Sequence, residues 1–243
     1  MNFGDIFNLI LYQPLFNALV LLYEYLPGHN FGVAVIVLTL LIKFLFYPLG
    51  SQAIRAQKAL NELQPKLQEI KEKYKNEKEK QAQATMELYQ KAKINPLSGC
   101  LPVLIQLPIL WALYRVFWMG FQTEQMKYLY GFVSHPGIIN PNFLGIINLS
   151  QPNIYLAVLA GILQFVQTKT AAPKTQKQNI SGKEAMAQMG RMMQKQMLYI
   201  FPLMTVMILW RLPSALGLYW LVTIIFSIIQ QYLIFKKQAP LKS

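Results

Sequence analysis

Lys43 is the residue whose position most needs a chemical explanation. It lies in the segment LTLLIKFLFYP, residues 38–48, inside an apolar run that extends from 31 to 49. A lysine near the centre of a bilayer costs about 2.5–3.5 kcal/mol on insertion scales, so such residues often serve a function. At about 1.5 Å per helical residue, Lys43 lies ~12 Å from Ser51, more than a lysine stem comfortably covers. Position alone leaves both snorkelling to the interface and a functional charge open.

Polar residues elsewhere in the apolar segments favour a functional charge. Thr39 precedes Lys43 by four residues, so its hydroxyl lies on the same helix face. Three more polar side chains lie in other apolar segments: Gln106, Thr223 and Ser227. Such side chains often form hydrogen bonds between membrane helices. Together with Lys43 they predict a wet, positively charged cavity, open to the cytoplasm, that accepts polar or acidic parts of a peptide.

The other chemistry-bearing residues do not indicate catalysis. All ten acidic residues lie outside the predicted spans, and His29 and His135 lie in predicted loops. The single cysteine, Cys100, permits no intramolecular disulfide. An intramembrane protease or a proton-coupled pump usually needs such groups inside the membrane. We therefore expect a protein that is not an enzyme and that binds no cofactor and no metal.

The composition is that of a polytopic membrane protein. Hydrophobic residues make up 54% of the 243 residues and charged residues only 14%, against about 25% charged residues in an average soluble domain. Several apolar runs approach the ~20 residues that a spanning helix needs. We expect an all-α protein with five transmembrane helices at 31–50, 96–119, 153–168, 196–211 and 214–235.

The N-terminal segment 1–30 is predicted to form an amphipathic helix in the membrane interface. Gln13, Asn17 and Glu24 fall on one face, and Pro14 interrupts the apolar run. Helices with one polar face commonly lie at the headgroup level. A sixth spanning helix is the alternative.

The charged segments give an orientation. Segment 51–95 is rich in Lys, Glu and Gln, and Pro65 interrupts its helical pattern, which predicts a helical hairpin. It holds ten Lys and Arg, whereas the loop 120–152 holds one. Positive charge marks the cytoplasmic side. We therefore expect a cytosolic hairpin, an extracytoplasmic loop at 120–152, a cytosolic loop at 169–195, a cytosolic tail at 236–243, and an N-outside, C-inside topology.

Four methionines precede the fourth predicted span at helical spacing: Met186, Met189, Met193 and Met197. Methionine is flexible and polarizable, so a methionine face suits apolar segments of varied shape. The alternative is a helical extension that packs on its neighbours.

Long stretches of the chain resemble the YidC/Oxa/Alb family of membrane protein insertases. The resemblance extends from about residue 13 to residue 235, and NPLSGCLPVLIQLPI, with three prolines at fixed spacing, is its most specific part. Three more segments carry it: FGVAVIVLTLLIKFLFYPL, LQPKLQEI and LPSALGLYWLVTIIFSIIQQYLI. The resemblance implies a compact member without the large outer domain, with five core helices and a hydrophilic groove closed to the outside.

The resemblance also assigns residues. Lys43 falls on the groove charge, where the family usually has arginine, and Thr39 lies one turn before it. Lysine keeps the charge but lacks the planar fork of arginine. The positions that match the family's second span and its aromatic pair, and so imply substrate contact, are Gln106, Leu107, Pro108, Tyr219 and Trp220.

The function that the resemblance implies is insertion of short or Sec-delivered membrane proteins, without ATP, in the bacterial cytoplasmic membrane. The expected partners are nascent or released substrates, the lipid bilayer, the Sec translocon and the ribosome. Lys237 and Lys242 can add a weak attraction to ribosomal RNA. One alternative is a transporter or channel that binds an anionic solute at Lys43. Another is a membrane-anchored scaffold whose hairpin recruits partners.

Overall fold

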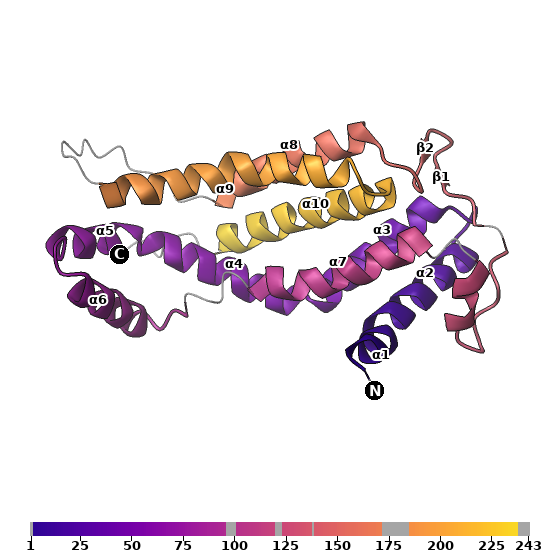
Figure 1. Ribbon diagram of the computed structural model, residues 1–243, viewed down its shortest axis with the longest axis horizontal. Coiled ribbons are helices and arrows are strands. Elements are labelled where there is room, and N and C mark those ends of the chain that lie inside the picture. Colours follow the sequence, from indigo (N-terminus) through magenta and orange to yellow (C-terminus); the bar gives the residue numbers. More distant parts are fainter. Residues whose placement is uncertain (1, 96–100, 120–122, 138, 172–184, 238–243) are drawn as a thin grey trace.

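The computed structural model describes residues 2–95, 101–119, 123–137, 139–171 and 185–237. Within these ranges the chain is mostly helical (Figure 1). The only strands there are β1 (Asn142–Phe143) and β2 (Ile147–Asn148), which pair antiparallel.

The N-terminal segment forms one nearly continuous helix. It consists of α1 (Phe3–Phe7), a π-helical turn (Asn8–Tyr12) and α2 (Gln13–Tyr25). Pro14 is the second residue of α2, so its missing N–H falls close to the point where the hydrogen-bond register changes. The segment Gly4–Tyr25 is long and apolar enough to span a membrane. Its position in the interface stays a prediction.

Asn17, which lies on the polar face predicted for this helix, is buried. It is only 1% exposed. Its Nδ2 donates to the carbonyl oxygens of Gln13 and Tyr128, at 2.7 and 2.9 Å, and its Oδ1 accepts from the Tyr130 N–H at 2.7 Å. The amide thus joins α2 to the segment after the 3-10 helix Thr123–Tyr128. Asn17 therefore packs α2 against this segment.

The first predicted span is a bent pair of helices. α3 (Phe31–Leu45) and α4 (Tyr47–Glu62) meet at an angle of 66°. The break falls just before Pro48, which has no N–H to continue the α3 ladder. α3 therefore ends five residues before the predicted boundary at residue 50, and α4 carries the chain away at an angle.

The polar segment that follows folds back on itself. Only Leu63 separates α4 from α5 (Gln64–Lys73), which has Pro65 in its first turn, where proline is tolerated. α6 (Lys78–Lys91) packs against α5 beyond a short turn (Figure 1). Its placement in the cytosol stays a prediction.

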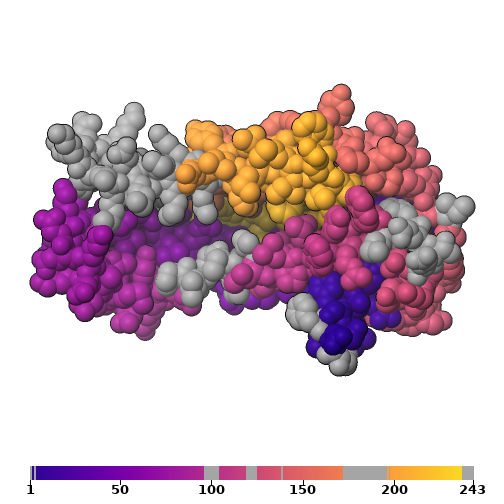
Figure 2. All heavy atoms as spheres, viewed as in Figure 1, coloured from indigo at the N-terminus to yellow at the C-terminus, as the bar shows by residue number. Residues whose placement is uncertain are grey.

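The remaining helices are α7 (Leu101–Met119), α8 (Ile154–Ala171), α9 (Ala185–Leu209) and α10 (Ser214–Lys237). α10 is central, because it contacts α3, α4, α7, α8 and α9. In the space-filling view it is set back between α9 and α7 (Figure 2). The aromatic ring of Phe31 on α3 packs edge-on against Phe117 on α7, which joins these helices in the buried core.

Three helices in the described part are long and apolar enough to cross a membrane: Gly4–Tyr25, Ile154–Ala171 and Ser214–Lys236. The bent α3–α4 pair, counted as one span, would make a fourth. Apolar helical segments at Leu104–Trp118 and Leu198–Leu209 are shorter. The structure is that of an all-α membrane protein, as the composition predicted. The count of five spans stays a prediction.

The segment after the strands covers the beginning of α10. The N–H groups of Ser214 and Ala215 donate to the carbonyl oxygens of Gln151 and Leu149, both at 2.9 Å. These bonds satisfy amides that have no partner in the first turn of a helix. Leu149 is fully buried, so the segment is packed into the same end of the bundle.

Candidate functional site

The ammonium group of Lys43 faces α10. Lys43 lies in the last turn of α3 and is partly buried. Its Nζ donates to Ser227 Oγ at 3.2 Å and lies 5.7 Å from the centroid of the Phe226 ring. The ion pairs found among the described residues lie in the α4–α6 segment, and none includes Lys43. The site therefore presents a positive charge with hydrogen-bonding capacity to spare.

An open cavity of about 50 Å³ lies beside this charge. A single water needs roughly 10–15 Å³, so the cavity has room for a few waters. Its walls come from α3, α4, α7 and α10 and are mainly apolar: Ile42, Lys43, Phe46, Leu49, Gly50, Ile105, Gln106, Ile109 and Gln230. We call it the Lys43 cavity. The Lys43 cavity brings together one cation and two amides.

Gln106 connects two walls of this region. Its Nε2 donates to the hydroxyl of Tyr219, so α7 and α10 are joined beside the cavity. Tyr219 is only 1% exposed. One turn further along α10, Thr223 Oγ1 is buried and has no hydrogen bond of normal geometry among the described residues. A buried hydroxyl in that state is a favourable place for a water or a polar ligand group.

Thr39 lies one helical turn before Lys43 and forms its hydrogen bond within α3. It is buried, and its Oγ1 donates to the Val35 carbonyl oxygen at 2.6 Å, within its own helix. No hydrogen bond joins Thr39 to Lys43 in the part of the chain that the structure describes, and Thr39 is absent from the cavity wall. Of the predicted polar lining, Gln106 and Ser227 therefore lie nearest the charge.

The predicted substrate-contact residues face several directions. Leu107 and Pro108 are exposed on the outer surface of α7 and do not line the Lys43 cavity. Tyr219 faces α7, whereas Trp220 faces α8, where its Nε1 donates to Gln164 Oε1 at 3.2 Å.

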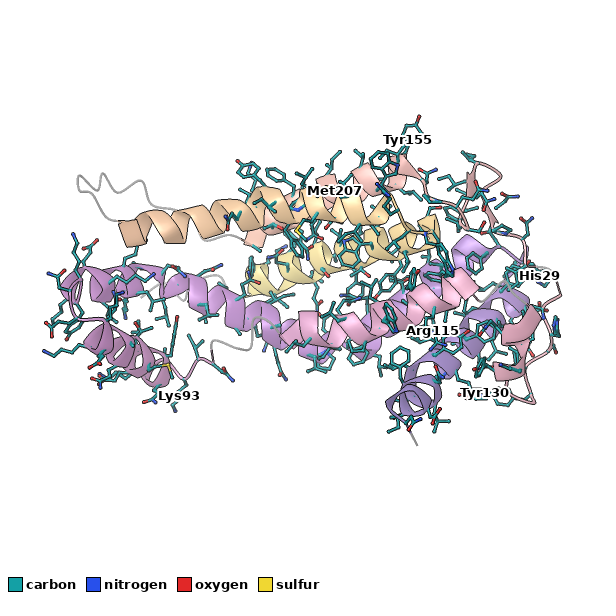
Figure 3. All side chains as sticks on the ribbon, viewed as in Figure 1. His29, Lys93, Arg115, Tyr130, Tyr155 and Met207 are labelled. Atoms are coloured by element: carbon teal, nitrogen blue, oxygen red, sulfur yellow. The ribbon has the colours of Figure 1, made fainter. Side chains whose placement is uncertain are left out.

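The predicted methionine stripe belongs to a single helix. Met186, Met189, Met193 and Met197 all lie on α9, which extends well before the fourth predicted span. Their side chains lie outside the described part of the structure. Further along α9, Met207 is 52% exposed, and Tyr155 at the start of α8 is 82% exposed (Figure 3).

A family model described as "60Kd inner membrane protein" matches residues 21–241. The chain belongs to this family. This confirms the resemblance seen in the sequence and, with the apolar helices, makes the chain a multi-pass membrane protein.

Three relatives share the printed name "Membrane protein insertase YidC". One from Fusobacterium nucleatum is 39% identical over 210 residues, which cover 86% of this chain and 88% of the relative. One from Geobacter metallireducens is 34% identical and covers 95% of this chain but 38% of its own length. One from Syntrophus aciditrophicus is 37% identical and covers 93% of this chain but 36% of its own length. The chain therefore spans little more than a third of the longer relatives.

Gln230 belongs to the site of this family member, and sequence reasoning missed it. It is only 3% exposed, lines the Lys43 cavity, and donates from Nε2 to the Tyr47 carbonyl oxygen and to Ser51 Oγ. A signal was available, because Gln230 follows Thr223 and Ser227 at helical spacing.

Arg115 was also missed, although it lies within the predicted span 96–119. Its Nη1 donates to Asn8 Oδ1 at 2.6 Å, and the guanidinium lies 4.7 Å from the centroid of the Tyr12 ring. Figure 3 shows Arg115 on the side of α7 toward the N-terminal helix. At about 1.5 Å per residue, it lies ~13 Å along α7 from Gln106, so it forms a separate site.

Proposed function

We propose that this protein is a membrane protein insertase of the bacterial cytoplasmic membrane, with five spanning helices, its N-terminus outside and its C-terminus inside. One observation carries the proposal. The ammonium of Lys43 lies at the wall of a cavity that also contains Gln106 and Gln230, and no described acidic group is paired with it. Family membership and the names of the relatives support the same function.

Lys43 attracts an acidic residue in the outer tail of a substrate. Two unit charges at 4 Å attract by roughly 4 kcal/mol at an effective dielectric constant of 20. Bringing an aspartate to the bilayer centre costs about 2.5–3.5 kcal/mol on insertion scales. The attraction between one such pair of charges is therefore large enough to offset the free-energy cost of moving one carboxylate to the bilayer centre.

The amides and hydroxyls beside Lys43 solvate the substrate's polar backbone part-way across the membrane. Gln106 presents an amide to the cavity, and Ser227 presents its hydroxyl to Lys43. Thr223, one turn before Ser227 on the same helix, adds a buried hydroxyl. Unpaired polar groups are expensive in a hydrocarbon core. Hydrogen bonds from these protein groups replace those from water and so lower the free-energy barrier to moving the substrate's polar backbone across the membrane.

The apolar helix of the substrate then moves into lipid along α7 and along α9 and α10. The exposed side chains of Leu107 and Pro108 border this route. Transfer of apolar groups from water yields about 0.8 kcal/mol per buried CH₂. A helix of ~20 apolar residues thus provides enough free energy for the step without ATP. The methionines of α9 either contact the apolar segment or pack on their neighbours.

The α5–α6 hairpin receives the nascent chain, the ribosome or the Sec translocon. Its surface is highly charged, with Lys80 beside Glu77 and Lys91 beside Glu87. Exposed pairs of this kind add little to stability, so these charges are available for a partner. The cytosolic location follows from the excess of Lys and Arg in the segment.

Rescue of bacteria depleted of their own insertase tests the proposed function. The full-length protein should restore growth and the insertion of a short membrane protein with an acidic outer tail. Uptake of an anionic solute into vesicles that contain the purified protein should not exceed that of empty vesicles. Failure of rescue at normal expression, together with solute flux, would support an anion transporter instead.

A further inference from the structure

Gln230 of α10 forms two hydrogen bonds to the beginning of α4. Its Nε2 carries two hydrogens, and both are used: one bond runs to the Tyr47 carbonyl oxygen at 3.0 Å and the other to Ser51 Oγ at 2.9 Å. Gln230 is only 3% exposed. A buried amide with both hydrogens committed to one neighbouring helix turn fixes the position of that turn.

The beginning of α4, to which Gln230 is bonded, is also where the chain changes direction. Phe46 separates α3 from α4 and has a backbone conformation outside the α-helical region, with φ −92° and ψ 10°. The two helices meet at 66°, and Tyr47 and Pro48 begin the second one. Phe46 keeps one backbone hydrogen bond to each side, because its N–H donates to the Ile42 carbonyl oxygen and its carbonyl oxygen accepts from Gly50. Pro48 has no N–H to add another bond across the bend, so side-chain contacts from α10 contribute to the angle of α4.

Gly50 makes the close approach possible. A Cβ atom on Gly50 would lie 3.2 Å from both the nitrogen and the oxygen of the Gln230 amide. Few side-chain contacts are that short, so a larger residue would push the amide away. The absence of a side chain at Gly50 therefore lets α10 reach the α4 backbone.

The face of α10 that carries Gln230 also binds the ammonium of Lys43. Ser227 precedes Gln230 by three residues, and it accepts the hydrogen bond from Lys43 Nζ. One helix face thus contacts the end of α3 through Ser227 and the start of α4 through Gln230. Lys43 and Gln230 both line the Lys43 cavity.

The far end of α4 is held separately. Asn61 Nδ2 donates to the Ala171 carbonyl oxygen at 2.8 Å, at the end of α8. The Lys58 ammonium lies 5.7 Å from the centroid of the Phe235 ring on α10. The far end of α4 therefore contacts the end of α8 and the last turns of α10.

We propose that Gln230 is a positioning residue that fixes the bend between α3 and α4 and thereby keeps the ammonium of Lys43 at the wall of the Lys43 cavity. The effect on the bend is independent of what the protein does. The effect on substrate choice rests on the proposed insertase function.

Spin-label distances in the full-length protein test the effect on the bend. In a Cys100→Ser background, labels at the exposed positions Leu41 and Glu62 report the angle between α3 and α4 in lipid vesicles. Gln230→Leu should broaden the distance distribution, because the amide bonds to Tyr47 and Ser51 are lost. Gln231→Leu is the matched control. Gln231 is a buried neighbour on the same helix whose Oε1 accepts a hydrogen bond from Thr170, and the control should keep the wild-type distribution.

Substrate choice tests the effect on Lys43. The same variants are assayed for insertion of one short protein with either an acidic or a neutral outer tail. A general structural defect lowers both yields alike. Displacement of Lys43 lowers only the acidic one, so Gln230→Leu should reduce the acidic-to-neutral ratio several-fold.

A wild-type distance distribution in Gln230→Leu would overturn the proposal, as would an unchanged insertion ratio in a wild type that shows tail preference. If Gln230→Leu does not fold, Ser51→Ala decides by the same two readouts, with smaller changes in the same direction. If the wild type inserts neither tail, the insertase function fails, while the distances still decide whether Gln230 fixes the bend.

Discussion

The Nζ of Lys43 and the Oγ of Ser227 lie 3.2 Å apart and join the last turn of α3 to α10. Ser227 in turn donates to the Thr223 carbonyl oxygen at 2.8 Å. The hydroxyl therefore gives one hydrogen and accepts another, which orients the ammonium toward α10. This contact makes the cation part of an organised site.

We predict that Ser227→Ala weakens insertion of substrates with acidic tails. A hydrogen bond to a charged group contributes about 1.5–3 kcal/mol, and its loss leaves the ammonium free to turn away from the cavity. Insertion of an acidic-tailed protein into vesicles should fall several-fold, with an unchanged amount of folded protein.

Thr39→Val is the matched control for that experiment. The Thr39 hydroxyl donates within its own helix to Val35 and does not reach the cavity wall. Valine preserves the branched shape, so insertion should remain close to that of the wild type. A loss in Thr39→Val equal to that in Ser227→Ala would place Thr39 in the groove after all.

We predict that Asn17→Ala lowers the stability of the folded protein. The substitution leaves the carbonyl oxygen of Tyr128 and the N–H of Tyr130 without the partners they have now. Each buried group that loses its partner costs about 1–3 kcal/mol. Thermal unfolding in detergent should begin several degrees lower than in the wild type.

Gln13→Ala serves as the comparison for Asn17. Gln13 takes part in the hydrogen bonds of this region through its backbone carbonyl oxygen, which alanine retains. Its unfolding temperature should match the wild type. Equal stability of Asn17→Ala and wild type would show that Asn17 does not hold the N-terminal helix to the segment after α7.

We predict that Arg115→Ala loosens the N-terminal helix. The guanidinium bonds to Asn8 and lies over the ring of Tyr12, and Tyr12 donates to Gln125 Oε1 at 2.9 Å. Cation–π contacts contribute about 0.5–1 kcal/mol at exposed sites and ~2 when desolvated. Hydrogen–deuterium exchange of residues 3–12 should become faster.

Arg115→Lys separates the charge from the shape of the side chain. Lysine keeps the positive charge but lacks the planar fork that binds and stacks at once, so exchange should be intermediate. Arg211→Ala, at an exposed position, is the control and should leave exchange of residues 3–12 unchanged. Unchanged exchange in Arg115→Ala would rule out Arg115 as the anchor of the N-terminal helix.

The helices followed from the sequence because their signals are local. The apolar runs placed α3, α7, α8 and α10 close to the segments predicted from the sequence, and Pro65 lies where α5 begins. α9 begins well before the predicted segment 196–211. The bend before Pro48 was not predicted. Proline breaks a helical ladder, but neighbouring elements decide whether the chain kinks or continues.

The partners of the polar side chains did not follow from the sequence. Lys43, Gln106 and Ser227 were predicted to lie together, and the structure brings them to one region. The burial of Asn17 was not predicted and Gln230 was missed, because residue spacing gives the face of a helix and not what covers that face. Only the packing of α2 and α10 on other elements revealed their roles.

The most direct test of the account is to vary the charge at Lys43 and the charge of the substrate tail together. Wild type, Lys43→Arg, Lys43→Ala and Lys43→Glu are reconstituted at equal amounts, and each inserts one short protein with either an acidic or a neutral outer tail. Wild type and Lys43→Arg should insert the acidic tail well. Lys43→Ala should lose about tenfold on that tail, which corresponds to roughly 1.4 kcal/mol, and Lys43→Glu should lose more, while neutral-tail insertion changes little. Equal insertion of the acidic tail by wild type and Lys43→Ala would contradict the account, because Lys43 would then be a snorkelling residue.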